Sequence, residues 1–596
     1  MFLRYTQRLK DGKAHRYWSI VENRRGPGKK VVQRQVLYLG EINDAQQAAW
    51  CRSIEVFESG SGQWRQVALF PEDREAPELA DEVVHIRLDQ LQVRRPRQWG
   101  ACWLSCQLWQ QLRLDGFWRS RLPPSREGTD WLEILKTLVS YRLIDPGSEW
   151  RLHREWYHRS AMGDLLGRTG DAIELQSLYR CMDKLLKHRR ELFTFLTERW
   201  RDLFHVGYEV LLYDLTSTYF ECDPPEHGKR RHGYSRDKRP DCVQVVIALV
   251  VTPDGFPLAY EVMAGNTSDK TTLKAFLEKI ETQYGKANRT WVMDRGVPTE
   301  EVLGEMRKGS SPVSYLVGTP RGRLTRLEKD FLKLPWAKVK DSVEVKLLPQ
   351  EGEVYILARS QGRRQKERAM RQRRLKRLWE RLHELQRQKL KRDELLLKLG
   401  AAKADAGNVY RLVDVHVPKA RETVSAETFT FSLRKEKLRA AIRNEGHYLL
   451  RSNLSDEDPA VLWQRYIQLT EIEAVFRDLK SDLALRPVFH QKDERIEAHI
   501  FVAFLAYCLY VTLQQRLRAL APGLTSRAVI EKMSAIQMVD VHLPTTDGRL
   551  LVLPRYTIPE KDHQLLLQRL HLELPPQPPP RISQEAEIPV THSPAL

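Results

Sequence analysis

The chain has 596 residues, too many for one ordinary hydrophobic core, so about two to four domains are expected. It carries 97 lysines and arginines against 78 aspartates and glutamates, a formal net charge of +19. This excess disfavours a protein built to bind cationic partners and favours a polyanion, nucleic acid above all. The alternative is a basic protein that is merely soluble.

Seven cysteines without a paired CxxC pattern indicate a reduced, cytosolic protein. The first residues turn polar at once, so export is not expected. The longest apolar stretch, Ile500 to Leu513, covers 14 residues, whereas crossing a bilayer takes roughly 20. We therefore predict a buried helix there, no membrane partner and a cytoplasmic location.

The amino-terminal third divides by periodicity. Residues 1–95 include alternating polar and apolar positions and are predicted to form a small β-rich module. Residues 96–205 have helical periodicity and are predicted to be a helical domain that binds DNA ends. Its tryptophans fall in apolar-periodic segments, which favours a core role over base stacking: Trp99, Trp103, Trp109, Trp118 and Trp131.

Residues 206–320 alternate strand and helix signals in the order β-β-β-α-β-α-β. Strands are predicted at 211–213, 243–251, 258–263, 291–294 and 315–318, and helices at 270–284 and 299–307. This order is that of an RNase H-like core. The predicted fold class is therefore α/β, an RNase H-like mixed sheet with flanking helices.

The remaining chain is predicted to interrupt and then complete this core. Residues 321–450 look like a β-rich insertion, and within it 361–400 form a long charged helical arm, either an antiparallel hairpin or a coiled coil. Helical periodicity resumes in 451–520, the second part of the core. Residues 521–572 form a carboxy-terminal region, and the proline-rich residues 573–596 are expected to be disordered.

Three carboxylates carry the chemical prediction. Asp214 and Asp294 each end a short apolar run, and Glu473 lies in a helical segment. Phosphodiester transfer needs carboxylate oxygens that hold two Mg²⁺ ions roughly 3.5–4 Å apart. Asp214 alone is equally well explained as a surface aspartate at a strand end, so the prediction depends on the fold bringing the three carboxylates together.

Several segments resemble motifs of DDE-type insertion-sequence transposases. The segment 213–221, Tyr-Asp-Leu-Thr-Ser-Thr-Tyr-Phe-Glu, is similar to the motif of the first aspartate. Residues 264–269 and Met293–Gly296, around the second aspartate, add to the likeness. One large transposase group has the motif Tyr-x2-Arg-x3-Glu-x6-Lys, which Tyr466, Glu473 and Lys480 match, while Leu469 replaces the arginine.

The resemblance implies a DNA transposase with Asp214, Asp294 and Glu473 as catalytic and metal-binding residues. The metal would be Mg²⁺, with Mn²⁺ as a substitute and two ions as the expected number. The partners implied are double-stranded DNA, both terminal inverted repeats and target, and a second copy of the chain in the DNA complex. The enzyme would act in the bacterial cytoplasm, at the nucleoid when bound to DNA. Two alternatives stay open: a nuclease without strand transfer, and a domesticated non-catalytic DNA-binding relative.

Helical spacing adds a prediction about DNA contacts. Positions seven apart return to nearly one helix face, so Tyr466, Glu473 and Lys480 are expected to line one side toward DNA. Glu471 is the fallback for Glu473. Without the two aspartates, a solvated charged helix face would be the preferred explanation of the segment.

Residues 228–239 form a basic loop after the first aspartate. Such a loop is typical of sequence-independent contacts to a DNA backbone, although a flexible solvated loop is the alternative. Cys222, His227, His232 and Cys242 lack the spacing of a zinc site. The predicted DNA contacts, besides Tyr466 and Lys480, are Lys229, Arg230, Arg231, Arg236, Lys238, Arg239 and Arg295.

Overall fold

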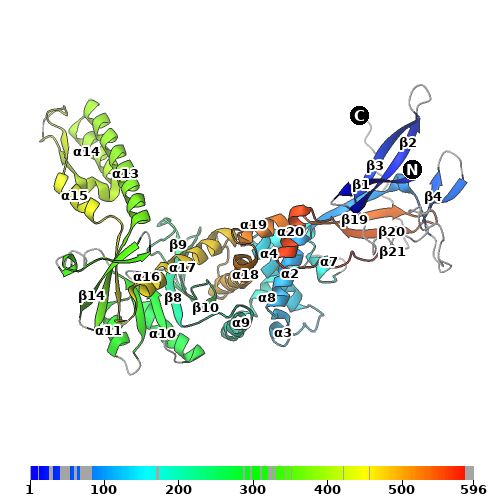
Figure 1. Ribbon diagram of the computed structural model, residues 1–596, viewed down its shortest axis with the longest axis horizontal. Helices are drawn as coiled ribbons and strands as arrows, with labels where there is room; N and C mark the ends of the chain where they lie inside the picture. Colours follow the sequence, from blue (N-terminus) through cyan, green and yellow to red (C-terminus); the bar gives the residue numbers. More distant parts are fainter. Residues whose placement is uncertain are drawn as a thin grey trace. The chain divides into compact units, whose positions relative to one another are not determined.

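A computed structural model of the chain (Figure 1) separates into two compact units. The first unit comprises Met1–Leu186, Asp482–Ala484 and Ile500–Leu596, and the second comprises Lys187–Ser481 and Leu485–His499. The structure describes residues 2–10, 13–25, 31–40, 54–58, 63–67, 84–168, 173–285, 289–294, 298–308, 312–319, 327, 330–340, 343–350, 352–388, 390–420, 422–455, 457–486 and 488–583.

The second unit is built on a nine-stranded sheet in the order β10-β9-β8-β11-β12-β18-β15-β14-β13. β8 pairs with β9, and β9 with β10, in antiparallel fashion, whereas β11 is parallel to both β8 and β12. This strand order confirms the RNase H-like mixed sheet predicted from the sequence. The strands of this part are β8 (Val210–Phe220), β9 (Val243–Val251), β10 (Pro257–Ala264), β11 (Thr290–Met293) and β12 (Ser314–Gly318).

One face of this sheet is buried by two helices, α10 (Asp269–Tyr284) and α11 (Glu300–Lys308). β9 is apolar at nearly every position, as expected of a strand covered on both faces, and all its residues are buried. Alternate residues of β8, Leu211, Tyr213 and Leu215, join Phe276 of α10 and Met306 of α11 in one apolar cluster. That pattern orients the remaining β8 residues toward the opposite face.

Part of the expected insertion extends the core sheet. β18 (His447–Ser452) pairs antiparallel with both β12 and β15, so it connects the two halves of the sheet. The strands beyond β18 are β15 (Glu353–Ser360), β14 (Val343–Gln350) and β13 (Ala337–Lys340). Periodicity reveals such strands but not their partners, because strand pairing is a long-range contact.

The charged arm is a helical hairpin. Helices α13 (Gln361–Arg387) and α14 (Arg392–Ala406) lie side by side (Figure 1). Their buried leucines, including Leu382 and Leu395, form a separate apolar cluster with the small sheet β16 (Val413–His416) and β17 (Thr430–Leu433). Of the two arrangements predicted for the arm, the antiparallel hairpin is therefore correct.

In the first unit, helices α2 (Gly100–Gln111), α4 (Trp131–Ile144) and the later part of α18 (Asp493–Leu520) contribute to an apolar core. The five tryptophans predicted to be core residues are all buried. α18 is long and apolar enough to cross a membrane, but 94% of its apolar window is buried inside the protein. This confirms the predicted buried helix.

Four strands of the first unit join its early and late segments in the order β21-β20-β19-β7. β7 pairs antiparallel with β19, far along the chain. The strands are β7 (Gln92–Gln98), β19 (Gln537–Pro544), β20 (Leu550–Tyr556) and β21 (Arg581–Ser583). Nearer the amino terminus, two three-stranded sheets have the orders β1-β2-β3 and β5-β4-β6. Their strands are β1 (Phe2–Lys10), β2 (Lys13–Arg25), β3 (Val31–Gly40), β4 (Ile54–Glu58), β5 (Gln63–Val67) and β6 (Val84–Ile86).

The proline-rich segment differs from the expectation of disorder over residues 573–583. Gln577 exchanges two hydrogen bonds with the backbone of Tyr556, whose hydroxyl donates to the Pro575 carbonyl. Arg581–Ser583 then pairs with β20. Proline lacks an N–H but keeps its carbonyl, so this segment is held through acceptors that composition does not reveal. Residues 584–596 lie outside the described residues.

Candidate active site

Asp214 lies in the middle of β8 rather than at its end, which corrects the position predicted for it. Thr216, Ser217 and Thr218 continue the strand because they pair with β9. On the other edge of β8, the parallel pairing with β11 ends at Tyr213 and Met293. Asp214 therefore occupies the first β8 position beyond the end of its shorter neighbour.

The register brings the two aspartates to adjacent positions. Asp294 follows Met293 directly, so it stands one residue beyond the last pair, level with Asp214. Leu211, Tyr213 and Met293 point into the α10–α11 cluster, so Asp214 alternates away from it. Continuing the same alternation by one residue places Asp294 on that same opposite face.

Glu473 is carried to this strand by a helix. α17 (Leu469–Arg477) contacts β8, with Ile472, Val475 and Phe476 buried and Glu473 exposed. Asp294 is also exposed, and Asp214 is partly buried. In the described part of the chain, groups of three His, Cys or carboxylate residues with all ligand atoms within 4.8 Å of one another include none of Asp214, Asp294 and Glu473. At least two of these three carboxylates therefore lie more than 4.8 Å apart.

The helical segment is not one uninterrupted α-helix, unlike the single helix from which the shared face was predicted. α16 (Pro459–Ile467) ends before Gln468, α17 follows, and Asp478–Asp482 adopt π-helical geometry. Tyr466 belongs to α16, where its ring lies 6.1 Å from Tyr448. Seven-residue spacing aligns side chains only along an uninterrupted α-helix, and a π turn rotates Lys480 away from that line.

Lys480 instead joins a cation cluster around Asp237. Its Nζ lies 2.7 Å from Asp237 Oδ1, and Arg486 Nη1 lies 2.5 Å from the same oxygen. Burial lowers the pKa of Lys480, while Asp237 opposes the shift and the nearby Arg236 adds to it. Two cations thus pair with one carboxylate and Arg236 lies near Lys480, which leaves a local excess of positive charge.

This cluster is tied to the strand of Asp214. The backbone N–H of Arg236 donates to Ser217 Oγ at 3.3 Å, and Ser217 lies three residues after Asp214 on β8. Three residues of a strand span about 10 Å. Sequence reasoning missed Arg486, since it lies six residues beyond the motif that ends at Lys480 and only the shared Asp237 connects the two.

The basic loop is anchored to the protein rather than freely solvated. Arg231 and Gln244 of β9 exchange backbone hydrogen bonds, and the Gly265 N–H donates to the Lys229 carbonyl at 2.9 Å. A Cβ on Gly265 would lie 2.1 Å from the Gln244 oxygen. The glycine of the 264–269 motif is therefore needed for the close approach of three backbone segments.

The predicted DNA contacts of the loop differ in how they are engaged. Lys229 bonds Glu497, Arg230 bonds the Gln491 carbonyl, Arg231 bonds two loop carbonyls, and Arg239 pairs with Asp241 and Glu221. Lys238 is exposed in a left-handed conformation with φ 60°, and Tyr234 is 82% exposed. Lys238 and Tyr234 are thus the most outward-facing members, and Arg295 lies outside the described residues.

Leu469, the departure from the motif, is buried at the start of α17. An arginine there would place its guanidinium against apolar side chains, so leucine suits the packing. The phosphate contact implied by the motif arginine has no counterpart at this position.

The three carboxylates form an all-oxygen donor set, which fits Mg²⁺ or Mn²⁺ rather than zinc. A cluster of possible metal ligands elsewhere in the described residues, Glu560, Asp562 and His563, lies at the start of helix α20 (Lys561–Arg569). There, His563 accepts the Glu560 N–H at Nδ1 and contacts the Lys532 carbonyl at 2.9 Å through Nε2. Both ring nitrogens are occupied, so that cluster caps a helix.

Two family models match segments of the chain. Residues 207–509, just over half of the chain, match the family model described as transposase DDE domain. Residues 3–55 match that of the IS1634 family transposase, N-terminal domain. No curated protein matches the chain.

Among solved structures, the cryo-EM structure of the piggyBac transposase synaptic complex with hairpin DNA aligns with a TM-score of 0.34 and 8% identity. The alignment covers 72% of this chain and 79% of that one. The match over 207–509 shows that the chain belongs to the DDE transposases, and its amino-terminal residues 3–55 are similar to the N-terminal domain of the IS1634 family.

Proposed function

We propose that the protein cuts DNA at transposon ends and joins the freed 3′-hydroxyl to target DNA. The observation that carries this is the adjacent register of Asp214 and Asp294 on one sheet face, with the Glu473 helix packed on the same strand. Family membership supports the reaction class. The specific residues are our assignment.

In this proposal Asp214, Asp294 and Glu473 hold two divalent ions. When bound, these ions neutralise the attacked phosphate and lower the pKa of the nucleophile. Cleavage forms a bond between water oxygen and phosphorus and breaks the P–O3′ bond, which releases a 3′-hydroxyl. In strand transfer that hydroxyl attacks a target phosphorus, and the target P–O3′ bond breaks.

The Asp237 cluster supplies phosphate contacts in this scheme. Lys480 and Arg486 share one carboxylate and Arg236 adds a third positive charge nearby, so the net charge attracts DNA phosphate to the strand of Asp214. Tyr466 and the basic loop, Lys238 foremost, extend the contact along the backbone, and Arg295 follows Asp294 directly in sequence.

The proposed substrates are the terminal inverted repeats of the element and a target duplex. Two copies of the chain would act together on the paired ends, in the bacterial cytoplasm at the nucleoid. The net charge of +19 and six described cysteines that are all free support an intracellular, DNA-associated protein.

The test uses purified full-length protein and a duplex that carries one element end next to flanking DNA. Asp214→Asn, Asp294→Asn and Glu473→Gln each keep side-chain volume but remove a ligand charge. Each should reduce Mg²⁺-dependent nicking by more than about 100-fold while end binding persists. A chelator should abolish nicking by the unaltered protein, and Mg²⁺ or Mn²⁺ should restore it.

The matched control is Glu471→Gln, two residues from Glu473 on the same helix, which should cleave normally. Normal cleavage by Asp214→Asn would overturn the assignment. Nicking without joined product in a strand-transfer assay would favour the nuclease alternative. Binding without nicking by the unaltered protein would favour the non-catalytic relative.

A further inference from the structure

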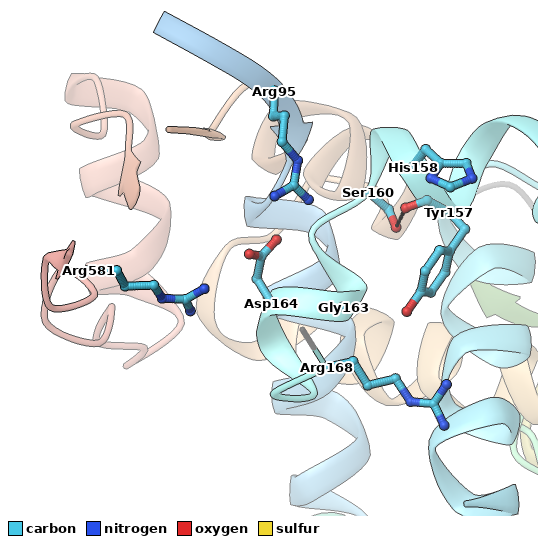
Figure 2. A pocket seen from close by; sticks show the side chains of 8 residues that line it. All are labelled: Arg95, Tyr157, His158, Ser160, Gly163, Asp164, Arg168 and Arg581. Atoms are coloured by element: carbon cyan, nitrogen blue, oxygen red, sulfur yellow. Dashed lines mark hydrogen bonds between the residues drawn. The ribbon is translucent and has the colours of Figure 1, made fainter. Parts of the chain in front are cut away.

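A cavity of about 260 Å³ lies in the first unit, apart from the carboxylates. Figure 2 shows Arg95 and Arg581 reaching toward Asp164 from different segments, with the ring of Tyr157 on a facing wall. Its lining residues come from β7, from the helical turns 157–168 and from β21: Arg95, Tyr157, His158, Ser160, Gly163, Asp164, Arg168 and Arg581.

Arg95 is held in an unusual backbone conformation at this cavity. Its φ is +51°, left-handed for a non-glycine residue, and it lies where the register between β7 and β19 shifts by a bulge. Such a conformation costs roughly 1–3 kcal/mol and is typically retained at functional positions. A bulge also re-aims side chains, and the Arg95 side chain is 67% exposed.

The carboxylates around the cavity, Asp164 and Asp540, are already paired with the buried Arg97. The buried Arg97 lies 2.7 Å from Asp164 through Nε and 2.9 Å from Asp540 through Nη2. Arg95 is 3.3 Å from Asp540, a carboxylate that Arg97 already binds through two nitrogens. The single acid that lines the cavity, Asp164, therefore offers little negative charge to its opening.

Positively charged side chains outnumber carboxylates around the cavity. Arg168 pairs with Glu133 at 2.6 Å, whereas Arg581, on the edge strand β21, has no ion pair among the described residues. Counted together, Arg95, Arg97, Arg168 and Arg581 face Asp164, Asp540 and Glu133, a surplus of one positive charge before His158 is considered. Burial raises the pKa of Tyr157, so its hydroxyl stays a neutral hydrogen-bond donor.

We propose that this cavity binds one phosphate group of the DNA backbone, with Arg95 and Arg581 as the principal contacts. The volume is below the roughly 300–1,000 Å³ of sites that enclose whole small ligands, which suits a single phosphate rather than a nucleotide. Guanidinium groups bind phosphate through two parallel hydrogen bonds. This inference rests on the proposed function, since DNA is the substrate there.

The experiment measures binding of a fluorescent element-end duplex by full-length Arg95→Gln/Arg581→Gln protein across a salt titration. Affinity should fall roughly tenfold, and the slope of log K against log[salt] should shrink by about 0.9, the value for one phosphate. Arg113→Gln is the matched control: it is also an exposed arginine at positive φ (54°) in the first unit, away from the cavity. It should leave the slope unchanged.

Arg95→Lys keeps the charge but loses the bidentate geometry, so it should show an intermediate affinity, and thermal melting checks that each variant folds. Unchanged affinity and slope in the double variant, with normal binding and nicking by the unaltered protein, would overturn this proposal alone. Failure of the unaltered protein to bind or nick would instead overturn the proposed function. A further outcome is that inorganic phosphate raises the melting temperature only when both arginines are present, while the affinity for DNA is the same with and without them. That result would show that the site binds free phosphate and would overturn the assignment to DNA.

Discussion

Gly265 shows how a single residue fixes the surroundings of the candidate site. Its position accommodates no side chain, because the Gln244 and Arg231 carbonyl oxygens would lie 2.1 and 2.3 Å from a Cβ. Both oxygens belong to the backbone, so they cannot move without disturbing β9 or the basic loop. The loop in turn carries Asp237, which holds Lys480 and Arg486.

Gly265→Ala should therefore destabilise the protein by about 1–3 kcal/mol, the usual cost of overpacking, and reduce DNA nicking further than stability alone explains. Thermal unfolding and the nicking assay measure the two effects. Gly304→Ala in α11 is the control, since a Cβ there meets nothing within 4 Å. It should raise stability by up to about 1 kcal/mol. Equal melting temperatures of the two variants would contradict the explanation.

At the scale of elements, a buried ion-pair network joins the two halves of the large sheet. Arg451 of β18 lies 2.6 Å from Glu353 of β15, and Arg307 of α11 lies 2.5 Å from the same carboxylate oxygen. The Tyr315 hydroxyl of β12 also donates to Glu353. Glu353 and Arg451 have side chains only 5% and 6% exposed, so neither has water as a substitute partner.

Removing the charge of Glu353 leaves the buried Arg451 with only the largely exposed Glu300 as a counterion and removes the pair between Arg307 and Glu353. Glu353→Gln is expected to lower the free energy of unfolding by about 3–5 kcal/mol. Glu344→Gln on neighbouring β14 is the matched control, because its pair with Arg359 is 40% and 35% exposed and is worth less than about 1 kcal/mol. Chemical denaturation measures the free energy of unfolding of both variants. If Glu353→Gln loses as little stability as Glu344→Gln, the predicted role of the buried network is contradicted.

Sequence patterns predicted the presence of helices and strands better than the residues at which they begin and end. The helix at 270–284 and the strand at 243–251 are reproduced within one residue, since both have uninterrupted periodicity. The end of β8 was not predictable, because Thr216–Thr218 remain in the strand only through their pairing with β9. The break at Gln468 and the π turn at Lys480 leave no compositional signal either.

For the whole molecule, the first unit is assembled from both ends of the chain. Gln98 of β7 pairs with Gln537 of β19, and the Trp99 ring stacks 4.3 Å from Tyr556. The Gly100 N–H donates to the Ile536 carbonyl at 2.8 Å. Contacts over such separations are invisible to local patterns, as is the Lys480–Asp237 pair beside the candidate site. The prediction of its carboxylates instead came from motif resemblance.

Truncation after Leu520 should therefore prevent the first unit from folding, even though residues 84–168 are intact, because β7 loses its partner and Trp99 its covering ring. Limited proteolysis should show rapid cleavage within 84–168, and the tryptophan emission should shift to longer wavelength. A chain ending at Ser583 retains every described strand and should resist the protease like the full protein. Equal resistance of the shorter chain would contradict this dependence.

The separation between Asp237 and Lys480 also affects when the protein becomes active during its synthesis. Domains tend to fold as they emerge, amino-terminal parts first. Asp214 and Asp294 can take their places early, but Glu473, Lys480 and Arg486 leave the ribosome only after the whole inserted segment and its helical arm. An interrupted chain of the proposed enzyme would thus carry two aspartates and the basic loop without the means to cut, so premature release of the chain would be harmless to the DNA.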